Sequence, residues 1–183
     1  MMLFMIKHLI SLSFFAAAAA SAQHHTDSPS HSPQSTASGY AGEEAREIKA
    51  LSAQEQRAWL EGQGIGLAKA AELNSYPGPM HVLEHANALK LSEAQKKGAQ
   101  ELMRRHKDEV RALGLELVSA ERRLDEVFKS RRATSVEVSG LTQQIGHLQA
   151  RIRASHLITH IEQTGMLRPE QVTAYDKVRG YRR

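Results

Sequence analysis

One long stretch in the second half of the chain places apolar residues at alternating intervals of four and three. It follows Ser92 and Gln95, whose spacing matches a capping box, in which the two side chains satisfy amides at a helix start. The series comprises Ala99, Met103, His106, Val110, Leu113, Leu117, Ala120, Leu124 and Val127. Such spacing puts these side chains on one side of a helix. We therefore predict a helix over 92–130, about 58 Å long at 1.5 Å per residue, with a seam for a second helix.

The same rhythm resumes after a short interruption. Thr134 and Glu137 match a second capping box, and Gly165 supplies a helix stop. Between them the residues that continue this spacing are Val138, Leu141, Ile145, Leu148, Ile152, Ser155 and Thr159. A turn of about three residues between two such helices forces them antiparallel, so we predict a long helical hairpin. A final short helix is expected to begin at Pro169.

The rest of the folded chain also has helical spacing, without strand-like alternation of useful length. We predict a helix over 41–60, a break at 74–79 and a short helix over 80–89. Aromatic residues make up 5% of the chain, and residues that favour helices dominate. The predicted fold class is all-α, a long antiparallel helical hairpin with short flanking helices. Because a thin hairpin buries little core, a homodimer is expected to supply further burial.

The N-terminal residues indicate export. An apolar run over 9–20 precedes small residues that match a signal-peptidase site, so residues 1–22 are interpreted as a cleaved signal peptide. The run is too short to anchor stably in a bilayer of about 30 Å, although an uncleaved anchor is the alternative. Residues 23–39, rich in Ser, Pro, Thr and His, are predicted to be a disordered linker. Residues 40–79 then form an N-terminal helical segment, and residues 80–181 form the hairpin domain.

Composition narrows the classes of function. The chain has no cysteine, which excludes an N-terminal lipid on cysteine, disulfides and thiolate metal sites. Its formal charge of +4 is spread along the sequence, which argues against a nucleic-acid partner. The sequence contains neither a phosphate-binding loop nor a dinucleotide fingerprint. These observations favour a soluble periplasmic protein.

Two short motifs resemble those of a known family. The segments Leu91-Ser92-Glu93-Ala94-Gln95 and Leu167-Arg168-Pro169-Glu170-Gln171 resemble the paired Leu-Thr-x-x-Gln motifs of the Spy/CpxP family of periplasmic chaperones. One opens the predicted long helix and the other follows the hairpin, so the resemblance covers about residues 80–181. The motif residues carried over are Leu91, Ser92, Gln95, Leu167, Pro169 and Gln171. Helix initiation is the simpler interpretation of Ser92 and Gln95.

The resemblance implies a curved dimer of helical hairpins that acts in the envelope stress response as an ATP-independent holdase. Its expected partners are unfolded or misfolded periplasmic proteins and an inner-membrane signalling protein. The concave face of such a dimer is basic and partly apolar. Residues of this chain with the charge for that face are Arg104, Arg105, Arg111, Arg122, Arg123, Arg151 and Arg153. For any one of them, a solvated helix surface explains the charge equally well.

Paired histidines resemble a second branch of the same structural group, the periplasmic heavy-metal sensors and zinc-resistance proteins. His81 and His85, like His156 and His160, are four residues apart, which places both imidazoles on one side of a helix. The hairpin register brings His106 level with the second pair. The candidate metal ligands are therefore His81, His85, His160 and His156, and Zn or Cu is the expected modulator of a holdase that requires no cofactor. The alternative function is a heavy-metal sensor or a metal-binding resistance protein.

A zinc-peptidase function is the enzymatic alternative, because the segment His81-Val82-Leu83-Glu84-His85 matches the H-x-x-E-H motif of inverted zinc peptidases. In that motif the histidines bind zinc and the glutamate activates water. Those peptidases are large α+β domains with a substrate-binding sheet edge, and this chain has neither the length nor the predicted strands. We therefore predict a non-enzymatic protein.

Overall fold

The computed structural model describes residues 38–182, and every regular element within them is a helix. The all-α prediction is confirmed for this part of the chain. The predicted signal peptide 1–22 and the predicted linker 23–39, up to residue 37, lie outside the described residues. Among residues 38–182 no helix combines the length and apolarity needed to cross a membrane. The elements are the 3-10 helix Glu43–Ala45 and the α-helices α1 Ala53–Glu61, α2 Lys69–Glu72, α3 Pro79–Glu84, α4 Glu93–Lys129, α5 Ser135–Gly165 and α6 Pro169–Val178.

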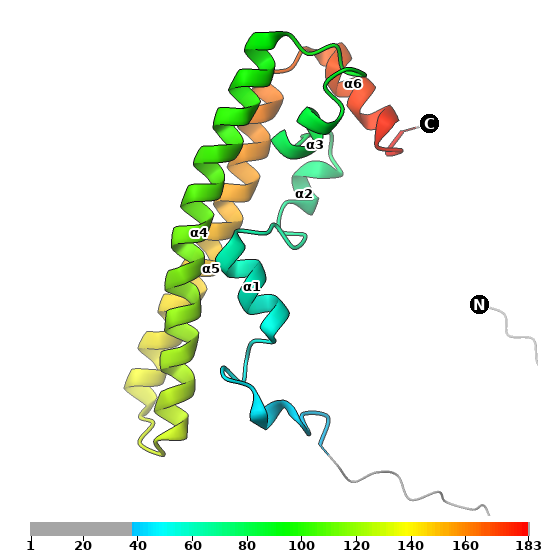
Figure 1. Cartoon of the computed structure of the whole chain (residues 1–183). Coiled ribbons are helices and arrows are strands. Elements are labelled where there is room, and N and C mark those ends of the chain that lie inside the picture. The colour runs from blue at the N-terminus through cyan, green and yellow to red at the C-terminus, as the bar shows by residue number, and fades with distance from the viewer. Residues whose placement is uncertain (1–37, 183) are drawn as a thin grey trace, which may run out of the picture. The chain divides into compact units, whose positions relative to one another are not determined.

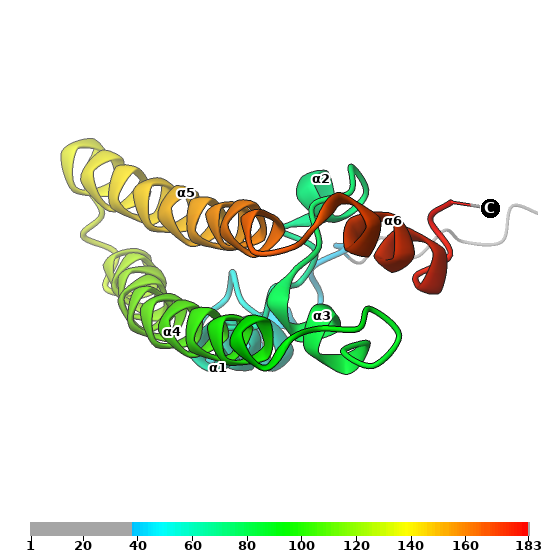
Figure 2. The same cartoon turned by 90° about the horizontal axis from the view of Figure 1, so that it is seen from above.

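The two longest helices, α4 and α5, lie side by side (Figures 1 and 2). Helix α4 begins with the predicted capping box: the Gln95 amide donates to Ser92 Oγ (3.2 Å), and the Ser92 amide donates to Gln95 Oε1 (3.0 Å). Helix α5 begins after Thr134, whose hydroxyl accepts from the Glu137 amide (3.3 Å). The contact between them buries Val110, Leu113, Leu117, Ala120, Ile145, Leu148 and Ile152, all members of the two predicted series. Each buried Val, Leu or Ile side chain among them contributes about 1.5–3 kcal/mol.

A second layer covers another side of α4. Helix α1 crosses α4 at Gly114, where a Cβ would lie 2.1 Å from the carbonyl oxygen of Trp59. Farther along α4, Val118 is buried against Ile48 and Leu51. Because these contacts lie outside the predicted seam, α4 is buried on two sides rather than one.

Helices α2, α3 and α6 gather near the end of the pair where α4 begins (Figure 1). Val82, Leu89, Leu91 and Tyr175 form a separate apolar cluster there. The Tyr175 hydroxyl donates to Glu72 Oε1 (2.5 Å), which ties α6 to α2. This arrangement holds α3 over the long pair and encloses the space described below.

The prediction of one helix over 41–60 is wrong. The chain forms a single 3-10 turn at 43–45, and α1 begins only at Ala53. Ser52 and Glu55 form a capping box, with the Ser52 amide donating to Glu55 Oε2 (2.8 Å) and the Glu55 amide donating to Ser52 Oγ (3.2 Å). This Ser-x-x-Glu spacing is the sequence signal for the later start.

Candidate functional site

A cavity of about 710 Å³ lies between the α1–α3 segment and the long helix pair. Residues 61–72 and the start of α3 form one wall, and α4 and α5 form the other. Its lining includes four histidines and two methionines: His81, His106, His156, His160, Met80 and Met103. Of the predicted metal ligands, His81, His156 and His160 therefore share one cavity, whereas His85 is not part of its lining.

Hydrogen bonds fix the tautomers of two of these histidines. Ser155 Oγ donates to Glu109 Oε2 (2.7 Å), so it accepts from His106 Nδ1 (3.0 Å). The neutral His106 ring then has a bare Nε2, which accepts from His156 Nδ1 (3.0 Å). It follows that the neutral His156 ring is unprotonated at Nε2, a buried atom that has no hydrogen-bond partner in the described structure.

Burial keeps this histidine pair neutral. Desolvation lowers the pKa of His106, and the neighbouring His160 lowers it further, while Glu109 opposes the shift. For His156, desolvation and the adjacent His106 and His160 lower the pKa from 6.5 to about 4. The two rings meet edge to face with their centroids 4.4 Å apart. At pH 7 the pair therefore presents neutral imidazole nitrogens, the form that binds metal ions.

His160 is held by the backbone and faces a gap left by a glycine. Its Nδ1 donates to the Tyr76 carbonyl oxygen (2.6 Å) and lies 3.7 Å from Glu72 Oε2. A Cβ on Gly78 would lie 2.7 Å from His160 Nε2, so the absence of a side chain there makes room for the ring. In metal-binding histidines, too, the ring nitrogen that does not bind the metal donates to an oxygen acceptor, which orients the ring.

The remaining histidines of the predicted set are placed differently. His81 Nδ1 donates to Glu84 Oε2 (2.6 Å), and this bond lowers the pKa of the exposed Glu84 carboxyl. His85, one turn later, is half-buried. Within residues 38–182, no three His, Asp or Glu side chains are grouped closely enough to hold a metal ion. The predicted set of four ligands is thus not assembled in this conformation, and metal binding by it stays a prediction.

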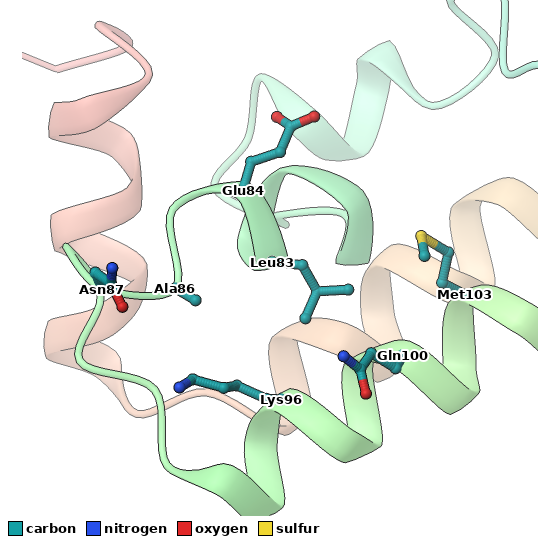
Figure 3. A pocket seen from close by; sticks show the side chains of 7 residues that line it. All are labelled: Leu83, Glu84, Ala86, Asn87, Lys96, Gln100 and Met103. Atoms are coloured by element: carbon teal, nitrogen blue, oxygen red, sulfur yellow. The ribbon is translucent and has the colours of Figure 1, made fainter.

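A smaller hollow of about 430 Å³ lies between the end of α3 and the first turns of α4 (Figure 3). Leu83 points toward α4, whereas Glu84 points away from it. Met103 lines both this hollow and the histidine-lined cavity.

The glutamines of the two motifs meet each other. Gln95 Nε2 donates to Gln171 Oε1 (2.8 Å), and Gln171 Nε2 donates back to Gln95 Oε1 (3.1 Å). Gln171 also accepts from the Arg168 amide (2.9 Å) and donates to the Leu89 carbonyl (3.1 Å), and Gln95 donates to the Met166 carbonyl (2.8 Å). Leu91 and Leu167 pack in the nearby apolar cluster, while Ser92 and Pro169 start their helices. These motif residues thus join the starts of α4 and α6.

The seven predicted client-binding arginines fall into two groups. Three are paired: Arg104 with Glu101 and Asp108, Arg105 with Glu162, and Arg122 with Glu47. The other four, which have no ion-pair partner among residues 38–182, are Arg111, Arg123, Arg151 and Arg153. All seven are exposed. The guanidinium groups of this second set are therefore available to acidic groups of a partner.

Helix α5 has an apolar surface that does not belong to the predicted seam. Ala150, Ala154, Ile158 and Ile161 are all exposed, and Ile158 and Ile161 are 51% and 57% exposed. At 100° per residue, Ile161 lies opposite the buried Ile152. We call these four residues the outer face of α5. The unpaired Arg151 and Arg153 flank it, and the spacing of four, four and three is visible in the sequence.

Comparisons of this chain with protein-family models, curated proteins and solved structures gave no significant match.

Proposed function

We propose that this protein is a non-enzymatic periplasmic holdase of the Spy/CpxP type, in which α4 and α5 form an antiparallel hairpin and two hairpins pair as a curved homodimer. It holds unfolded or misfolded proteins without ATP during envelope stress, and the exported chain works with an inner-membrane signalling protein. The outer face of α5 carries the proposal.

That face combines the two properties a holdase needs. Ile158 and Ile161 offer apolar area to an unfolded chain, at about 25 cal/mol for each Å² removed from water. Arg151 and Arg153 beside them are exposed, with no ion-pair partner in the described residues, so they are available to acidic groups of a client. A helix that is apolar on two opposite sides is normally buried on both. The exposed second side therefore supports a partner outside this chain.

Suppression of aggregation tests the proposal. A chemically denatured client is diluted into buffer with the purified protein at substoichiometric and stoichiometric ratios, and light scattering is recorded. We expect the wild type to suppress scattering and an Ile158→Ser, Ile161→Ser variant to lose most of this activity. The matched control is Val136→Ser, which removes an apolar side chain 82% exposed elsewhere on α5. No suppression at any ratio, or equal suppression by all variants, contradicts the proposal.

The arginines and the dimer have separate tests. An Arg151→Ala, Arg153→Ala variant should lose suppression of an acidic client, whereas Arg104→Ala, which removes an already paired arginine, should not. Sedimentation of the outer-face variant reports whether the same face joins two copies. A variant that becomes monomeric yet still suppresses aggregation assigns the face to the dimer instead of the client.

A second candidate function is metal sensing or metal resistance, with a divalent ion or copper as modulator. The observation that favours it is the convergence of His81, His106, His156 and His160 on one cavity. Calorimetric titration with Zn, Cu, Ni and Co, compared with a His81→Ala, His85→Ala variant, tests the predicted ligand set. Equal binding by both proteins removes those two histidines from the site.

A further inference from the structure

We propose that the cavity binds Cu(I) through His156 Nε2, His160 Nε2 and the thioether sulfur of Met103. This inference rests on the second candidate function and deepens it, because it names the ion and the ligand atoms. It does not depend on holdase activity.

The first ligand atom is a buried lone pair without a partner. His156 is 7% exposed, lines the cavity, and commits its Nδ1 hydrogen to His106. Its Nε2 therefore has an acceptor lone pair with no hydrogen-bond donor in the described structure. A buried polar atom left unsatisfied costs about 1–3 kcal/mol. A cation at this nitrogen removes that cost.

The second ligand atom is on the same side of α5. His160 follows His156 by four residues, so both imidazoles project from neighbouring turns into the cavity. Its Nδ1 hydrogen is used by the Tyr76 carbonyl, so the neutral ring also has an unprotonated Nε2, next to Gly78. Both rings are thus preoriented by hydrogen bonds at Nδ1 with Nε2 available as ligand.

The third ligand decides the ion. Met103 is half-buried and lines the cavity, and thioether sulfur selects Cu(I) over zinc. Zinc sites use four ligands from thiolate, imidazole and carboxylate, and no three His, Asp or Glu side chains in residues 38–182 are grouped for that. The cavity carboxylate of Glu72 accepts from the hydroxyls of Tyr175 and Tyr181 through Oε1, and its Oε2 lies 3.7 Å from His160 Nδ1, the ring nitrogen that is not offered to the ion. Two imidazoles and a thioether remain, a set suited to Cu(I).

Anaerobic competition with the Cu(I) chelator bicinchoninate tests the site on the full chain. All proteins carry three substitutions that remove the histidines of the predicted linker: His24→Asn, His25→Asn and His31→Asn. We expect one Cu(I) per chain, and more than about 100-fold weaker binding after His156→Asn or His160→Asn. In His156→Asn the introduced amide nitrogen replaces ring Nδ1 and keeps the bond to His106, so the fold is preserved. The matched control, His85→Asn, lies outside the cavity lining and should bind like wild type.

X-ray absorption on the Cu(I)-loaded protein identifies the ligands without relying on variants. We expect nitrogen scatterers and one sulfur scatterer, with the sulfur lost in Met103→Leu, a substitution of similar volume. Equal Cu(I) affinity in wild type and His156→Asn, or a copper shell without sulfur, overturns the inference. If Zn, Ni or Co binds tightly while Cu(I) does not, the inference fails and the second candidate function survives.

Discussion

Protonation of His156 should make the folded protein selectively sensitive to mild acid. Burial and the neighbouring histidines lower its pKa to about 4 in the folded state, against an ordinary value of 6.5. Between pH 6.5 and about 4, His156 binds a proton in the unfolded chain but not in the folded chain. The free energy of unfolding therefore falls as the pH falls. One pH unit between the two pKa values corresponds to about 1.4 kcal/mol. The loss is therefore about 2 kcal/mol at pH 5 and about 3 kcal/mol at pH 4.

Urea unfolding followed by circular dichroism at pH 7, 6 and 5 measures this loss. Carboxyl groups also titrate as the pH falls, so the informative quantity is the difference between wild type and His156→Asn. This variant retains an amide donor for His106, but its residue 156 no longer titrates in this range. Wild type should lose about 2 kcal/mol more than the variant between pH 7 and 5. A His147→Asn variant, altered on the exposed side of α5, controls for the loss of a histidine. Parallel pH profiles for wild type and His156→Asn would refute the reasoning.

Three further substitutions test the packing. Gly114→Ala should lower the free energy of unfolding by about 1–3 kcal/mol, because the new methyl group overlaps the Trp59 carbonyl of α1. The fluorescence emission of Trp59, the single tryptophan, should shift as well. The control, Gly146→Ala, faces open space and should raise the free energy of unfolding by about 0.5–1 kcal/mol. Gln171→Leu should lower the free energy of unfolding, measured in urea, by about 1–3 kcal/mol, because it leaves the groups bonded to this buried amide without partners. An unchanged urea midpoint would contradict the role of Gln171 in linking α6 to α4. Burial raises the pKa of the Glu121 carboxyl, so the folded state favours the protonated acid and loses stability as the pH rises. Glu121→Gln should therefore raise the thermal midpoint at pH 7 but not at pH 4, and a gain equal at both pH values would exclude this explanation.

The seam between α4 and α5 was predictable because alternating intervals of three and four report directly which side of a helix is buried. Leu117 and Ile152, for example, belong to the predicted series and are almost fully buried. The second layer was not predictable in this way. Val118 is buried by the irregular segment that carries Ile48 and Leu51. Gly114 is buried by the short helix α1, whose backbone at Trp59 comes close to it. Neither contact follows a periodic pattern in the sequence.

The candidate site shows the same division. Spacing alone indicated that His156 and His160 share a side of one helix and that His106 lies level with them. Which nitrogen of each imidazole carries the proton depends on side-chain geometry that the sequence does not show. The hydrogen bonds of Ser155 with Glu109 and with His106 determine that His106 Nε2 is unprotonated. The hydrogen bonds of this relay join residues 46, 49 and 50 positions apart in sequence. No local pattern in the sequence encodes them.

Ion binding and client binding, as proposed here, use opposite sides of the same turns of α5. His156 and His160 face the cavity, while Ile158 and Ile161 lie on the outer face. At 100° per residue, Ile158 is about 160° from both His156 and His160, so its substitution leaves the histidine contacts in place. The two proposals are therefore separable by mutation. If Cu(I) nevertheless alters aggregation suppression in wild type but not in a His156→Asn protein, the two sites are coupled through the helix pair, because α4 supplies Met103 to the ion and α5 supplies both histidines and the outer face.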